Sequence, residues 1–139
     1  VPCFLPRQIV SLSRWWTRTA AAEVATAMGR AILAAMRADE RSQLLTQIQQ
    51  ADEAHWQTVA KEIQLSISEY QELGCCTSFG SWQKDVNAIA VAFYPGNGMP
   101  PVSINCGGPA FTLSSSFLLA EVRPRLLDLV RRLKLSLGT

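Results

Sequence analysis

Strict alternation of side-chain size between residues 86 and 109 limits the fold of this chain more than any other sequence feature. From Asn87 to Tyr94, bulky side chains alternate with alanines, so an extended strand would have one bulky face and one nearly bare face. Pro95–Pro101 holds two glycines and three prolines, which turn a chain, and Val102–Cys106 then alternates again. These residues predict a β-hairpin, and Gly107–Pro109 are expected to end its regular pairing.

The bare face of this hairpin is the feature that bears most directly on function. Its side chains are all small or amide-bearing: Ala88, Ala90, Ala92, Ser103 and Asn105. Such a face either lies under a closely packed helix or leaves room for a small polar ligand. The alternation alone leaves both alternatives open.

Length and composition are those of one globular domain. Of the 139 residues, 48% are hydrophobic and 17% are charged, and the formal net charge of +2 is too small to indicate a nucleic-acid or membrane partner by itself. No apolar run reaches the roughly 18 to 20 residues that span a bilayer, and no signal-peptide pattern opens the chain, so we expect a cytoplasmic location. A start at Val1 without methionine predicts a fragment of a longer protein.

Residues that usually carry out chemistry are sparse. The four cysteines have no metal-binding spacing, and the single histidine, His55, falls in the first turn of a predicted helix. We therefore expect reduced, buried thiols and a solvated histidine. No phosphate-binding glycine loop, metalloprotease motif or nucleophile elbow occurs. Without an acid–base pair we predict a binding module rather than an enzyme, with no catalytic residue, metal or cofactor.

Helical patterns surround the hairpin and predict an α+β domain. The expected elements are a strand at Ile9–Trp15, an alanine-rich helix ending at Met36, a short helix at Arg41–Ile48, a long amphipathic helix from Asp52 to Gly74, an extended segment at Cys75–Phe79 and a C-terminal helix after Ser114–Ser116. In this last helix one apolar stripe is expected: Val122, Leu126, Leu129, Val130, Leu133 and Leu137. We expect an antiparallel sheet with helices packed on one face and a ligand pocket against the other.

The start of the alanine-rich helix decides whether it can bind an anion. With Thr26 as N-cap, the amides of Ala27, Met28 and Gly29 would point outward from the positive end of the helix and could receive a carboxylate. If the helix instead begins near Ala20, Gly29 only lets another element pack closely. Both alternatives fit the sequence.

Four segments, in this order, resemble the effector-binding domain of isocitrate-lyase-regulator (IclR) type bacterial transcription factors. They are Thr26–Ala34, the long helix ending at Gly74, Gly80–Ala90 and Gly107–Leu113. The resemblance covers about Val10 to Leu137 and implies a GAF/PAS-like effector-binding domain, with residues 1–139 as one domain. It implies that an N-terminal winged helix-turn-helix and the first part of the effector domain are absent, that the protein forms dimers or tetramers, and that it meets DNA only through the absent domain.

The same resemblance, carried over position by position, implies a site for a small organic acid or aromatic acid effector. The implied residues are Ala27, Met28, Gly29, Ser78, Phe79, Ala88, Asn105 and Gly107. Phe79 and Asp85 depart from the family pattern, in which an acid and a glycine are usual. The alternative is a structural oligomerisation module without a ligand, indicated by the adjacent Trp15 and Trp16 and the leucine-rich C-terminal helix.

Overall fold

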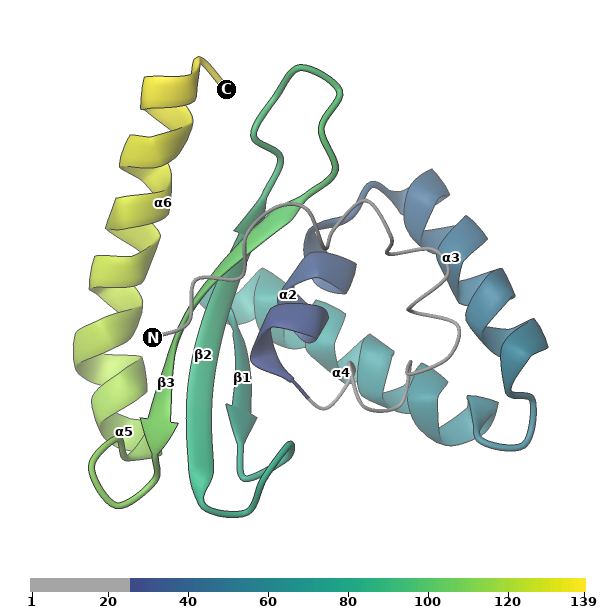
Figure 1. Ribbon diagram of the computed structural model, residues 1–139, viewed down its shortest axis with the longest axis horizontal. Helices are drawn as coiled ribbons and strands as arrows, with labels where there is room; N and C mark the ends of the chain where they lie inside the picture. The colour runs from purple at the N-terminus through teal and green to yellow at the C-terminus, as the bar shows by residue number, and fades with distance from the viewer. Residues whose placement is uncertain (1–25) are drawn as a thin grey trace.

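The structure, a computed structural model, describes residues 26–139 (Figure 1). Its elements in chain order are α2 (Ala27–Ala35), α3 (Ala38–Ala51), α4 (Trp56–Leu73), β1 (Cys76–Phe79), β2 (Val86–Phe93), β3 (Val102–Pro109), α5 (Ser115–Phe117), η2 (Leu118–Val122) and α6 (Arg123–Leu137). The predicted strand at Ile9–Trp15 and the Trp15–Trp16 pair lie outside the described residues. Within residues 26–139, no helix is both long and apolar enough to cross a membrane.

The three strands form an antiparallel sheet in the order β1-β2-β3. The hairpin predicted from the alternation is β2 and β3, joined by the glycine- and proline-rich turn. Pairing continues through Gly107, Gly108 and Pro109, which lie opposite Ala88, Asn87 and Val86, so the expectation that these residues end the pairing is wrong. A glycine without a side chain can stay in a ladder where its neighbour leaves no room for a Cβ.

Helices cover both faces of this sheet (Figure 1). Ala90 and Ala92 pack with α2, α3 and α4 on one side, whereas Ile89 and Val91 pack with η2 and α6 on the other. The predicted α+β class with an antiparallel sheet is confirmed. The cover lies on two faces rather than one because the bulky face is apolar as well, and burying it requires a second layer.

The first described helix begins where Thr26 caps it. Thr26 has an extended backbone, with φ −89° and ψ 146°, and its side-chain oxygen accepts a hydrogen bond from the Gly29 amide at 3.0 Å. This N-cap satisfies one of the amides that lack an intrahelical acceptor. Of the two predicted starts, the one at Thr26 is therefore confirmed.

The long helix α4 begins at Trp56, four residues after the expected start at Asp52. Asp52 instead follows the end of α3, and its carboxylate accepts a hydrogen bond from the backbone amide of His55 at 3.3 Å. His55 is exposed, as predicted, and its ring lies 2.9 Å from the same carboxylate. The C-terminal end is also confirmed, since Gly74 adopts the left-handed conformation with φ 74°.

The C-terminal helical segment contains a wide turn. Ser114 caps its start by accepting a hydrogen bond from the Phe117 amide at 3.2 Å. Over Leu118–Val122 the segment is a π-helix, and the Arg123 amide donates to the Leu118 carbonyl five residues back. Pro124, the next residue, has no amide proton and its ring would clash with the carbonyl four residues earlier, which accounts for the widening.

Only part of the predicted stripe on α6 faces the sheet. Leu126 and Val130 are buried, but Leu129 and Leu137 are 44% and 53% exposed. The expected apolar stripe is therefore only partly buried. Residues 126 and 130 are four apart and share one side of the helix, which is the side that meets β2.

Candidate functional site

The small-residue face of the sheet lies beneath α2. This helix contacts all three strands, and its Ala27 and Ala31 belong to the same buried cluster as Ala90 and Ala92. The C-terminal end of α2 lies near the end of β2, because the amide of Arg37, just after the helix, donates to the hydroxyl of Tyr94, just after β2. The start of α2 therefore lies toward Ala88.

Three of the implied site residues form one row across the sheet. Ser78 on β1 lies opposite Ala88 on β2, which in turn lies opposite Gly107 on β3. A Cβ at Gly107 would stand 2.8 Å from the Ala88 Cβ and 3.2 Å from the Asn87 carbonyl oxygen. The row therefore has only small side chains and no room for one at position 107.

The small-residue face is buried to different degrees along its length. This bears on the two alternatives for such a face, a closely packed helix and room for a small polar ligand. Ala90 and Ala92 are 0% and 4% exposed beneath α2, as expected under a closely packed helix. Ala88, Asn105 and Gly107 are only half-buried, and so is Met28 near the start of α2. Ser78, opposite Ala88, and Ala27, at the start of α2, are 3% and 2% exposed. The tight packing therefore covers the middle of the face and its β1 side, while the β2–β3 side near the start of α2 is less completely covered.

Phe79 is not brought to this face. It lies opposite Asn87 and packs against the cluster on the α6 side, together with Ile89 and Val91. Successive side chains of a strand point to opposite faces, so Ser78 and Phe79 cannot both line one site on the sheet. Asp85 lies in the loop before β2, where its carbonyl accepts a hydrogen bond from the Ala110 amide at 2.8 Å.

The start of α2 offers hydrogen-bond donors to a ligand. Thr26 accepts from the Gly29 amide, whereas the amides of Ala27 and Met28 precede the first residue that finds an intrahelical acceptor. The helix dipole adds partial positive charge at this end. Such an arrangement can hold a carboxylate by hydrogen bonds.

A polar network that the sequence did not reveal fixes α2 against β1 and α4. One guanidinium nitrogen of Arg30 donates to the Thr77 carbonyl at 2.7 Å, and the other lies 3.3 Å from the Glu62 carboxylate. From α4, Glu69 accepts from the Thr77 amide at 2.6 Å and from its hydroxyl at 2.7 Å. The only sequence signal for this network is the place of Arg30 in the Thr26–Ala34 segment.

The thiol of Cys76, on this face, is expected to be unreactive. Cys76 is fully buried, and burial, with the Glu69 carboxylate as a second cause, raises the pKa of Cys76 to about 12. Its sulfur donates a weak hydrogen bond to the Ser66 carbonyl at 3.5 Å. A neutral thiol is neither a nucleophile nor a metal ligand, so Cys76 serves as a small core residue, as predicted.

Comparison with protein families gives one match. Residues 22–135 match the model of the family described as bacterial transcriptional regulator IclR C-terminal. A search of curated proteins found no match.

Several solved structures are similar to this chain over most of its length, and two of them illustrate the likeness. An IclR family transcriptional regulator from Brucella abortus is 32% identical, with a TM-score of 0.73 over 81% of this chain and 43% of that one. The inducer binding domain of the PobR transcription factor from Acinetobacter, a double mutant in complex with 3-hydroxybenzoic acid, is 18% identical, with a TM-score of 0.61 over 81% of this chain and 66% of that one. This chain therefore spans less than half of the Brucella protein.

Proposed function

Because this chain belongs to the IclR family of bacterial transcriptional regulators, as their C-terminal domain, we propose that it is the small-molecule sensor of such a regulator. In this proposal residues 1–139 form one effector-binding domain, and a winged helix-turn-helix elsewhere in the protein binds DNA. Effector binding favours one of two arrangements of a dimer or tetramer and so changes DNA binding. The domain itself has no catalytic activity.

The observation that carries the proposal is the half-buried end of the small-residue face beside the start of α2. The ligand carboxylate accepts hydrogen bonds from the amides of Ala27 and Met28, next to Gly29. Its body rests on the flat row at Ala88 and Gly107. Ser78, at the β1 end of this row, and Asn105, opposite Ala90 beside it, supply the polar contacts that orient the ligand.

We propose a small organic acid or aromatic acid as the effector. An anion suits the positive end of α2, and a compact or flat body suits a floor without large side chains. The PobR inducer binding domain, which shares this fold, was solved with 3-hydroxybenzoic acid. Hydroxybenzoates are therefore the first ligands to test, followed by keto acids and dicarboxylates.

Thermal unfolding with a panel of these acids tests the proposal. A ligand present at 100 times its Kd should add about 2.7 kcal/mol of stability. Ala88→Leu should abolish the shift by filling the row, and Asn105→Ala should weaken it while leaving the floor intact. Ala54→Leu, at an exposed position outside the site, is the matched control and should respond as the wild type does.

The proposal fails if no acid in a broad panel shifts the unfolding temperature. It fails equally if Ala88→Leu folds and responds as strongly as the wild type, because the ligand would then bind elsewhere.

Exposed leucines on α6 favour a second function, a structural oligomerisation module. Leu129, Leu135 and Leu137 are 44%, 66% and 53% exposed. Sedimentation of Leu129→Lys and Leu135→Lys variants, alongside Trp15→Ala and Trp16→Ala, tests this function. Loss of assembly in a chain that binds none of the acids would favour the module over the sensor.

A further inference from the structure

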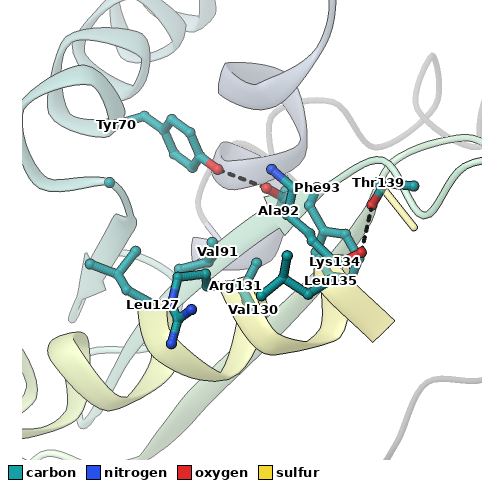
Figure 2. A pocket seen from close by; sticks show the side chains of 11 residues that line it. Tyr70, Val91, Ala92, Phe93, Leu127, Val130, Arg131, Lys134, Leu135 and Thr139 are labelled. Carbon is teal, nitrogen blue, oxygen red and sulfur yellow. Dashed lines mark hydrogen bonds between the residues drawn. The ribbon is translucent and has the colours of Figure 1, made fainter. Parts of the chain in front are cut away.

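A cavity of about 440 Å³, largely open to solvent, lies at the other end of β2, between α4 and α6 (Figure 2). In the part of the chain that the structure describes, β1 is short and pairs with β2 only as far as Ala90, so that Val91–Phe93 run on without a neighbouring strand from residues 26–139 on that side. The end of α4 and the face of α6 flank this gap. Its lining residues are Tyr70, Gly74, Val91, Ala92, Phe93, Leu127, Val130, Arg131, Lys134, Leu135 and Thr139.

The interior of this cavity is apolar. Val91, Phe93 and Val130 are core residues that form its floor, and Leu127 and Leu135 extend the apolar surface toward solvent. The hydroxyl of Tyr70 already donates to the Ala92 carbonyl at 2.7 Å, as the dashed line in Figure 2 shows. A ligand here would therefore be held mainly through an apolar body.

The charged side chains of the cavity are both cationic. Among its lining residues only Arg131 and Lys134 have charged side chains, and none has a carboxylate side chain. Arg131 bonds to Asp128 at 2.8 Å, but Asp128 is shared with Arg132, so two guanidinium groups face one carboxylate. This part of α6 keeps a net positive charge, which favours an anionic ligand group.

We propose that this cavity is a second ligand site, which takes a small organic anion with an aromatic body. The body lies on Val91 and Phe93, between Tyr70 and Leu127, and the anionic group meets Lys134 and Arg131 at the rim. The volume is within the roughly 300–1,000 Å³ usual for small-molecule sites. None of the residues implied for the effector site lines this cavity, so the second site goes beyond the sensor function and stands independently of it.

Fluorescence titration of the 139-residue chain with 8-anilinonaphthalene-1-sulfonate tests the site. Lys134→Glu should raise the Kd of this probe at least tenfold, because it reverses the charge that meets the sulfonate. Lys61→Glu makes the same change on the exposed side of α4, outside the cavity, and should leave the Kd within a factor of two. Leu135→Trp, at a 66% exposed rim position, should weaken binding by filling the mouth.

Three further measurements make the outcome decisive. The uncharged analogue N-phenyl-1-naphthylamine should bind at least tenfold more weakly than the sulfonate, and equal binding would overturn the role of the cations. Unchanged affinity in both Lys134→Glu and Leu135→Trp would overturn the site itself. Ala88→Leu should leave probe binding unaffected, so a failure of the effector site and a failure of this site are distinguishable. Circular dichroism confirms that each variant is folded.

Discussion

Gly107 on β3 and Ala88 on β2 face each other across the sheet with no room for a second methyl group between them. A Cβ at position 107 would stand 2.8 Å from the Ala88 Cβ, closer than side-chain carbons approach in proteins. Because of this contact the row has no space for an added side chain. Substitutions at these two positions should therefore disturb the proposed effector floor more than substitutions elsewhere on the face.

Gly107→Ala should therefore destabilise the fold by about 1–3 kcal/mol, the usual cost of forcing a methyl group into a packed interior. Adding Ala88→Gly removes the clashing methyl and should recover part of this loss. Urea unfolding of the wild type, both single variants and the double variant measures the coupling. Strictly additive effects of the two substitutions would contradict the contact.

Arg30→Met should cost about 1.5–3 kcal/mol, because it removes a charged donor and leaves the Thr77 carbonyl in need of a partner. The side chain of Arg30 is only 14% exposed, so solvent compensates little. Arg125→Met is the matched control, since that side chain is 77% exposed and its ion pair with Glu121 is long at 3.8 Å. We expect a change below about 0.5 kcal/mol for the control. Equal losses in chemical denaturation would show that Arg30 does not anchor α2.

The buried thiols should make the fold less stable in alkali. Burial, with Glu69 as a second cause, raises the pKa of Cys75 to about 11 and that of Cys76 to about 12, against an ordinary value of 9.0. Above pH 9 the unfolded chain loses these protons while the folded chain keeps them. The folded state then binds more protons, so the unfolding free energy falls as pH rises from 9 to 11, by up to about 1.4 kcal/mol per pH unit for each thiol.

Urea unfolding at pH 7.5, 9 and 10 measures this dependence. Cys75→Ala and Cys76→Ala should each reduce the slope of stability against pH, whatever they do to stability at pH 7.5. A slope that is the same in both variants as in the wild type would mean that other groups cause it.

Tyr94→Phe should cost about 1–2 kcal/mol by removing two hydrogen bonds of one hydroxyl. That hydroxyl accepts from the Arg37 amide at 3.0 Å and donates to the Glu40 carboxylate at 2.7 Å. The Arg37 guanidinium, 4.6 Å from the ring centroid, can still lie over phenylalanine, so the substitution isolates the hydroxyl. Ser42→Ala, which deletes an exposed hydroxyl on α3, should change the thermal unfolding midpoint far less.

Much of the fold follows from local patterns in the sequence. The alternation at Ile89, Val91 and Phe93 is enough to predict β2 and its bulky face, because strand side chains have a period of two. Thr26 and Gly74 mark two helix ends, since a hydroxyl cap and a left-handed glycine act within a few residues of themselves.

Contacts between distant segments could not be predicted in this way. Arg30 and Thr77 are 47 residues apart, and no local pattern records their hydrogen bond. Only the resemblance implies Phe79 as a site residue, because β1 has four residues, too few for the period of two to show which face each occupies. The cavity between α4 and α6 depends on where β1 stops relative to β2, which only the assembled sheet reveals.

The hydrogen bonds of Thr77 have a consequence for self-association. Within residues 26–139, β1 is an edge strand of the sheet, and an open edge invites another chain to pair with it and aggregate. The outward amide of Thr77 is already bound to Glu69, and its carbonyl is bound to Arg30. Two charged side chains therefore occupy the outward backbone groups of Thr77, so an incoming strand cannot pair with this part of β1.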